Sequence, residues 1–280
     1  MNETRGSRIL GSLTTGGGGR SVVVALVSTA VFVAVIAFAV VNSAGWEDVK
    51  QSFFNRQEFE EAFPDILSAF WINVKIFLIA EVFILVFALV IAILRGLPGP
   101  VFFPIRALTV VYVDLFRGVP TILVIYILGF GVPALALPGV PIDPLFWGIV
   151  SLVLVYSAYV SEVYRAGIDS VHPSQAAAAR SLGLTHGQAL RFVVIPQAVR
   201  RVVPPLLNDF IGLQKDTALV ALLGVVEAFR QSQIDVAGSF NYTPYIATAI
   251  IFIALTIPMA RFTDWLIARD KRRQQAGRLA

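Results

Sequence analysis

Residues 21–41 read SVVVALVSTAVFVAVIAFAVV, a stretch of 21 residues without a charged side chain. A helix of about 20 apolar residues crosses the hydrocarbon core of a bilayer, so this stretch predicts a transmembrane helix. It is longer than the apolar region of a secretory signal, and no clear small-residue cleavage site follows it. We therefore expect residues 21–41 to remain in the mature protein as a membrane helix.

The composition of the whole chain also indicates a membrane protein. Of its 280 residues, 57% are hydrophobic and 14% are charged, whereas soluble domains are about half apolar and a quarter charged. The chain has no cysteine, which excludes disulfide scaffolds, thiolate metal sites and thiol catalysis. Its two histidines, His172 and His186, cannot build a zinc site by themselves.

Further apolar stretches predict additional membrane spans. They are Ile66–Leu94, Val119–Leu137, Pro144–Ser161, Val202–Val226 and Tyr242–Ala260. Charged residues interrupt two of these stretches, Lys75 and Glu81 in the first and Asp209, Lys215 and Asp216 in the fourth. We expect an all-α membrane protein with about six transmembrane helices.

The basic residues predict the orientation of these helices, because Lys and Arg accumulate in cytoplasmic segments. With the N-terminus inside, 16 of the 22 basic residues fall on the inner side, and the outer side holds Lys50, Arg56 and Arg230. Both termini are therefore expected in the cytoplasm. This asymmetry accounts for the net charge of +4 without a nucleic acid partner.

The chain is then divided into segments by charge and hydropathy. In order, we expect a glycine-rich cytoplasmic tail (1–20), an N-terminal transmembrane helix (21–41), an external acidic segment with a short surface helix (42–65), a membrane domain (66–262) with a cytoplasmic loop (162–201), and a basic cytoplasmic tail (263–280). The run Gly16–Gly19 precedes Arg20 and Ser21 and lacks the lysine and strand of a P-loop. No motif for binding ATP is found in this chain.

The cytoplasmic loop has the pattern of two short helices. Ser174 can cap a first helix over Gln175–Leu182, which Gly183 ends in a left-handed conformation. Thr185 and Gln188 form a capping-box pattern for a second helix, which Pro196 is expected to end. The apolar side chains of the loop must pack on something; they are Leu182, Leu184, Leu190, Val193 and Val194.

Three interpretations of the loop are open. Residues 178–185, AARSLGLT, have the pattern of a helix-turn-helix that reads DNA. A loop held at a membrane cannot easily enter a major groove, so we favour a docking surface for a cytoplasmic partner subunit. The remaining interpretation is a loop that folds back on its own bundle.

Several motifs in order resemble the permease subunits of binding-protein-dependent ABC importers, in particular those for polar amino acids. Ala177, Ala178, Ala179, Gly183 and residues 193–196 follow the family's EAA loop, written E-A-A-x3-G-x9-I-x-L-P. Similar segments are LFRGVP (115–120), SEVYRAG (161–167), PQAVRR (196–201), PPLLN (204–208) and KDTALV (215–220). The resemblance extends from about Ile66 to the C-terminus.

This resemblance implies a function and a set of partners. The chain would be a non-catalytic permease in the bacterial cytoplasmic membrane, paired with an identical or homologous second permease. An external binding protein would deliver the amino acid, and separate ATPase subunits would bind ATP and Mg²⁺. The five-helix family core would make residues 21–41 an added helix. The ATPase contact implied by the loop would involve Ala177, Ala178, Ala179, Arg180, Gly183, Leu184, Thr185, Gln188, Ile195 and Pro196.

This sequence departs from the family pattern at the first position of the EAA motif, where Ala177 stands in place of glutamate. The substitution removes a polar contact, either within the loop or to the ATPase. The neighbouring register is intact, so we expect weaker coupling rather than none. A second, non-identical permease could retain the acid.

Charged groups within the spans are candidates for the translocation pathway, because an ion in the bilayer costs at least ~2.5–3.5 kcal/mol. Lys75 is expected to snorkel. Glu81 either pairs with a neighbouring helix, is held protonated, or faces the pathway and favours a cationic or ammonium-bearing solute. For Lys215, Asp216 and Thr217, bonding between helices and contact with the solute are equally open. Asn208 completes the candidate pathway residues.

Two other classes of function are considered. An ion-coupled secondary carrier would explain Glu81 and Asp216 but not the patterned loop, and it is distinguished by ionophores against ATP depletion. A membrane-anchored regulator that reads DNA or protein has support only from the loop.

Overall fold

The computed structural model describes residues 18–279, with side chains for residues 21–269. The regular elements within this range are all helices, which confirms the all-α class. Most of the expected tail at 1–20 lies outside the described residues, as do the side chains beyond 269 in the expected basic tail. The chain divides into two compact units, one ending at Asn55 and one beginning at Arg56.

The first unit contains helices α2 (Gly18–Val41) and α3 (Trp46–Phe53). The large apolar side chains of α2 are exposed along its length, with Phe38 exposed to 71%. A helix that is apolar on every side suits a hydrocarbon environment. The helix α3 carries acidic residues in its first turn, where the helix dipole favours them. It forms the expected short helix within the acidic segment 42–65.

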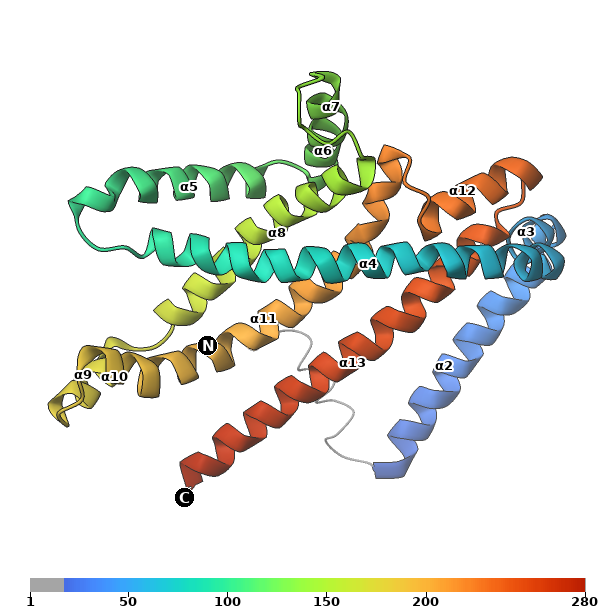
Figure 1. Ribbon diagram of the computed structural model, residues 1–280. Coiled ribbons are helices and arrows are strands. Elements are labelled where there is room, and N and C mark those ends of the chain that lie inside the picture. The colour runs from blue at the N-terminus through green and yellow to red at the C-terminus, as the bar shows by residue number, and fades with distance from the viewer. Residues whose placement is uncertain (1–17, 280) are drawn as a thin grey trace. The chain divides into compact units, whose positions relative to one another are not determined.

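The second unit is a bundle of long helices with shorter elements at its two ends (Figure 1). In chain order it contains α4 (Arg56–Arg95), η1 (Pro100–Phe102), α5 (Phe103–Gly118), α6 (Thr121–Tyr126), η2 (Ile127–Gly131), α7 (Val132–Ala134), α8 (Pro144–Asp169), α9 (Pro173–Ser181), α10 (His186–Ala189), η3 (Leu190–Val194), α11 (Ile195–Asp216), η4 (Thr217–Leu223), α12 (Ala228–Ser239) and α13 (Thr243–Leu279). Figure 1 shows α9 and α10 beyond one end of α8, and α6 and α7 at its other end.

Four helical segments in the described part of the chain are long and apolar enough to cross a membrane: Ser21–Val41, Trp46–Arg95, Pro144–Asp169 and Thr243–Arg269. The second of these comprises α3 and α4. A fifth span is obtained if two helical stretches bent by 106°, Pro100–Gly118 and Thr121–Ala134, count as one. The expected count of six is not confirmed. The expected span Val202–Val226 falls on α11 and η4. These helices are not among the four apolar segments, and Asp209, Lys215 and Asp216 interrupt the apolar sequence there.

The bend between α5 and α6 has a local cause. Pro120 restricts the residue before it to extended conformations, and Val119 adopts φ −96° and ψ 132°. The helix α5 therefore ends at Gly118, and a new helix starts at Thr121 in another direction. The sequence predicted a span over Val119–Leu137, which begins at this break; the structure divides that stretch into α6, the π turn η2 and the short helix α7.

The helix α4 begins at Arg56, ten residues before the expected start of the second span at Ile66. The end of the expected external segment therefore belongs to α4, and Pro64 lies within the helix without breaking it. At 1.5 Å per residue its 40 residues extend about 60 Å. This exceeds the ~30 Å hydrocarbon core, so part of α4 must project beyond it.

The main core lies where α4 packs on α8, the most extensive helix contact of the unit. Ile76, Ala80, Ile84 and Ala88 follow one another every four residues on α4, and each is 0% exposed. This spacing places them on one helical face. The close approach of α8 to η4 depends on Gly148 of α8. An added Cβ at this position would lie 2.5 Å from the side chain of Val220 on η4.

A buried polar network joins α4 to the segment between η4 and α12. The Asn73 amide donates to Glu227 Oε2 at 2.6 Å and to Thr217 Oγ1 at 3.1 Å. Asn73 Oδ1 accepts from the backbone N–H of Ala228 at 3.1 Å, and Glu227 caps the start of α12. Each of these side chains is at most 1% exposed, so water cannot replace a lost partner.

We predict that Asn73→Leu destabilises the protein by ~1–3 kcal/mol for each buried partner it leaves unsatisfied. Thermal unfolding of the purified protein in detergent measures this. The control is Asn208→Leu, because Asn208 is exposed on α11, and its transition should stay close to that of the wild type. An Asn73→Leu protein as stable as this control would contradict the role of the network.

Candidate functional site

The loop between α8 and α11 begins with α9, which His172 caps. Its Nδ1 atom accepts a hydrogen bond from the backbone N–H of Ser174 at 3.2 Å. The predicted cap at Ser174 is wrong, because Ser174 already lies inside the helix. Pro173 occupies the first helical position, where its missing N–H costs nothing. Arg201 donates to the carbonyl of Ser170 and so joins α11 to the end of α8.

The end of α9 confirms the predicted turn. Gly183 adopts φ +89°, a left-handed conformation that an L side chain disfavours. The backbone N–H of Leu184 donates to the carbonyl of Ala179 at 3.3 Å, and that of Gly183 to the carbonyl of Arg180 at 3.0 Å. These two bonds define a Schellman motif, which fixes the angle between the two short helices.

The capping box that starts the second helix is also confirmed. The backbone N–H of Gln188 donates to Thr185 Oγ1 at 3.3 Å, and that of Thr185 to Gln188 Oε1 at 2.9 Å. The expected end at Pro196 is wrong, because α10 continues through a wider π turn, η3, into α11. A π turn relieves the clash that proline causes with the carbonyl four residues earlier.

The loop has a small buried interior and an exposed apolar surface. Ala179 and Ala189 are buried, at 6% and 1% exposure. Leu182 is 83% exposed and Phe192 63% exposed, and the side chains of Ala177 and Ala178 are exposed as well. Large apolar side chains left exposed together are typical of a surface that a partner covers.

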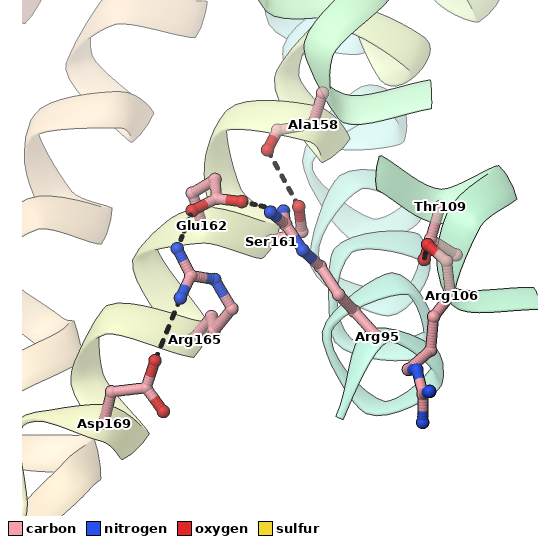
Figure 2. Close-up of polar contacts among 8 residues, drawn as sticks. All are labelled: Arg95, Arg106, Thr109, Ala158, Ser161, Glu162, Arg165 and Asp169. Atoms are coloured by element: carbon pink, nitrogen blue, oxygen red, sulfur yellow. Dashed lines mark hydrogen bonds and ion pairs between the residues drawn. The ribbon is translucent and has the colours of Figure 1, made fainter. Parts of the chain in front are cut away.

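A charged network lies where α8 leaves the bundle (Figure 2). Glu162 forms an ion pair with Arg95 at the end of α4 and a second pair with Arg165, at 2.6 Å. Arg165 also pairs with Asp169 at 3.0 Å. Glu162 is therefore the link between two helices. Arg95 is one of the basic residues counted on the inner side, and no local pattern indicates this pair, because Glu162 lies 67 residues away.

Arg106 and Thr109 of α5 lie beside this network in Figure 2 without a contact to it. Arg106 instead donates to the carbonyls of Leu97 and Gly99, at 2.6 and 2.8 Å. These bonds hold the turn between α4 and α5. The charge of Arg106 thus stabilises a turn, whereas that of Arg95 connects two long helices.

A polar cleft of about 450 Å³ adjoins the network. Its charged and polar lining comes from α5, α8 and α11: Arg117, Tyr159, Glu162, Arg201 and Asp209. Both signs of charge therefore face one cleft. Such a lining can bind a zwitterion, with cations for a carboxylate and carboxylates for an ammonium group.

The consecutive residues Lys215, Asp216 and Thr217 contact three different parts of the structure. Lys215 is exposed and lines a separate cavity beside α12 and α13. Asp216 accepts a hydrogen bond at 2.9 Å from the hydroxyl of Tyr156 on α8. Thr217 is fully buried in the Asn73 network. Neighbours on a helix point about 100° apart, which explains this separation.

Two further carboxylates lie inside the bundle. Glu81 on α4 is half-buried and interacts electrostatically with Asp209 on α11. Asp209 Oδ2 is buried and has no hydrogen-bond partner within residues 18–279. Asn208 beside it is exposed. In the sequence Asp209 is only a charge that interrupts an apolar stretch, and nothing there indicates that one of its oxygens is buried.

Comparison with known proteins identifies the family. The family described as binding-protein-dependent transport system inner membrane component matches residues 99–272, more than half of the chain. The chain belongs to this family. It is a membrane component of a transport system.

Relatives and solved structures agree with this assignment. The probable amino-acid permease protein YxeN of Bacillus subtilis is 35% identical over 197 residues, covering 70% of this chain and 87% of the relative. The glutamate transport system permease protein GluC of Corynebacterium glutamicum is 32% identical, with 70% and 90% covered. A crystal structure of an amino acid ABC transporter with histidines has a TM-score of 0.68 at 30% identity, covering 78% of this chain and 98% of that chain. The methionine transporter MetNI shares the fold at 17% identity, with a TM-score of 0.57.

We predict that the Arg95–Glu162 pair has a measurable coupling energy, because its side chains are only 22% and 17% exposed. A double-mutant cycle with Arg95→Gln and Glu162→Gln should exceed the ~0.2–1 kcal/mol of exposed pairs and stay below the ~3–5 kcal/mol lost on breaking fully buried ones.

Unfolding of the detergent-solubilised protein provides the energies for this cycle. The control is the Arg56–Glu60 pair on α4, which has side chains 90% and 60% exposed and should couple weakly. Equal coupling in both pairs would show that Glu162 does not link α4 to α8.

Proposed function

We propose that this chain is a permease subunit of an ATP-driven importer of polar amino acids in a bacterial cytoplasmic membrane. The family membership supports a permease of a binding-protein-dependent system. The names of the relatives, which include amino-acid, glutamine and arginine permeases, support the class of solute. The solved transporter crystallised with histidines supports the same class.

The observation that carries the proposal is the folded loop with exposed apolar residues. A cytoplasmic ATPase subunit, which binds ATP and Mg²⁺, covers Leu182 and the adjoining surface of α9 and α10. Because α10 runs through η3 into α11 without a break, force applied to the loop reaches the membrane helix directly. The bond from Arg201 to Ser170 carries the same motion to α8.

The position of Ala177 in the loop indicates which contact the family's glutamate would make. The side chain of Ala177 is exposed, and its carbonyl accepts a bond from Ser181 Oγ at 3.1 Å. A glutamate at this position would face outward, so the contact it loses is one to the ATPase rather than one within the loop. A second permease, identical or homologous, completes the pore and determines whether that contact exists elsewhere in the complex.

The translocation pathway runs past the polar cleft and the buried carboxylates. Arg117 and Arg201 attract the carboxylate of an amino acid delivered by an external binding protein. Glu81, Asp209 and Asp216 offer negative charge to its ammonium group. Asn208, Lys215 and Thr217 remain predicted pathway residues.

Copurification tests the proposal. The tagged protein is isolated in mild detergent and its companions are identified, with Leu182→Asp as the variant that disrupts the exposed apolar surface. Recovery of a P-loop ATPase with the wild type, and its loss with Leu182→Asp, is the expected result. A preparation without any ATPase would overturn the importer.

The second candidate is an ion-coupled secondary carrier, which the carboxylates Glu81, Asp209 and Asp216 favour. Uptake by whole cells separates the two. Depletion of ATP abolishes uptake by the importer even when the membrane potential is maintained. An ionophore that collapses the ion gradient abolishes uptake by the carrier while ATP is still present.

We predict that Gly183→Pro abolishes transport while membrane insertion stays intact. Proline is fixed near φ −65° and cannot adopt the φ of +89° at this position, so the two short helices lose their mutual angle. Uptake of labelled amino acid should fall at least tenfold.

Gly187→Ala is the matched control for Gly183→Pro. Gly187 lies in the same loop, and an added Cβ meets no atom within 4 Å, so uptake should stay near the wild-type rate. Wild-type uptake by Gly183→Pro would refute the coupling role of the loop.

We predict that Glu81→Gln raises the KM for the transported amino acid about tenfold, the equivalent of ~1.4 kcal/mol, because a charge that attracts the ammonium group is lost. The preference for cationic over neutral amino acids should fall as well. Uptake kinetics measure both values. Glu60→Gln, exposed on the same helix, should leave them unchanged. Unaltered affinity and selectivity in Glu81→Gln would remove Glu81 from the pathway.

A further inference from the structure

A groove between α11 and α13 is separate from the loop and from the polar cleft. It has a volume of about 330 Å³, and its walls are mainly apolar. The apolar residues include Val199, Val203, Leu266 and Ile267. The remaining lining includes two arginines, Arg200 on α11 and Arg269 on α13. An apolar groove that carries two cations suits an amphipathic anion.

The position of the groove along α13 relates it to the membrane surface. The helix starts at Thr243, and Trp265 lies 22 positions further along it, a rise of about 33 Å. This matches the ~30 Å hydrocarbon core, so Trp265 reaches the far interface, where tryptophan is enriched. The guanidinium of Arg269 lies 5.2 Å from the centre of the Trp265 ring, one turn further out. The two residues thus lie at the level of lipid headgroups.

The charges around the groove favour an anion. Within residues 21–269, no carboxylate forms an ion pair with Arg200 or Arg269, whereas Arg261 pairs with Asp264 at 3.6 Å. Beyond the groove, the helix α13 continues to Leu279. Its last ten residues carry Asp270 against four basic residues, Lys271, Arg272, Arg273 and Arg278. Basic clusters next to a membrane helix attract anionic lipids.

We propose that the α11–α13 groove is a binding site for an anionic phospholipid. An acyl chain lies against Val203 and Leu266, and the phosphate binds between the guanidinium groups of Arg200 and Arg269. A guanidinium matches phosphate with paired N–H donors. The apolar walls on α13 lie at the edge of the hydrocarbon core, next to the headgroups, where an acyl chain is available and the apolar surface is covered by lipid.

A lipid in this groove contacts both α11 and α13. The helix α11 follows directly from the loop through η3, and α13 contributes the other wall of the groove. A lipid bound between them connects the two helices at the membrane surface. The composition of the cytoplasmic leaflet then affects how α11 moves relative to α13.

Tryptophan fluorescence tests the binding site, because Trp265 lies beside it. Full-length protein with Trp46, Trp71 and Trp147 changed to Phe is reconstituted in phosphatidylcholine with increasing fractions of brominated phosphatidylglycerol. The quenching of Trp265 gives the binding constant of the anionic lipid relative to phosphatidylcholine. We expect a constant clearly above one, lowered about fivefold by Arg200→Gln and again about fivefold by Arg269→Gln.

Arg261→Gln is the matched control, since Arg261 is exposed on α13 and does not line the groove. It should leave the relative constant unchanged. Val203→Phe, which fills the groove without changing charge, should lower it. Equal binding of the two lipids, or an Arg261→Gln effect as large as that of Arg269→Gln, would overturn the site in favour of diffuse surface attraction.

A second measurement does not depend on the tryptophan substitutions. Native mass spectrometry of the otherwise unmodified protein, with phosphatidylglycerol added, should show a retained lipid that Arg200→Gln loses and Arg261→Gln keeps. Retention by all variants would overturn the site. Neither readout requires transport, so both are independent of the proposed importer function.

Discussion

The hydrocarbon core of the membrane offers no water to backbone N–H and C=O groups, and this constraint shapes the whole chain. Each spanning segment must satisfy its own backbone, so the apolar stretches become helices. One departure from regular α-helix lies where protein surrounds the backbone. It is the 3-10 turn η4, in which Thr217, Val220, Ala221 and Leu223 are buried.

The same constraint determines where polar side chains lie. Asn73, Thr217 and Glu227 satisfy one another in a closed network, and Glu162 joins the ends of α4 and α8 through arginines. Asp209 differs, because one of its oxygens is buried without a partner among the described residues. The first two groups stabilise helix contacts, whereas this oxygen of Asp209 contributes no such bond.

The prediction from sequence succeeded where the structural cause is local. Gly183, Thr185 and Gln188 form the expected turn and cap, because each acts on residues at most four positions away. It failed at His172 and at Pro196, where two local options compete. A histidine ring replaces the serine cap, and a π turn lets the helix continue through the proline.

The sequence by itself determined the helical class, the membrane spans of continuous apolar character and the short helices of the loop. Composition and spacings of three or four residues suffice for these features. Only the tertiary structure decided that Arg95 binds Glu162 and that Tyr156 binds Asp216. These contacts join residues 60 or more positions apart, and helix packing, rather than any local pattern, brings them together.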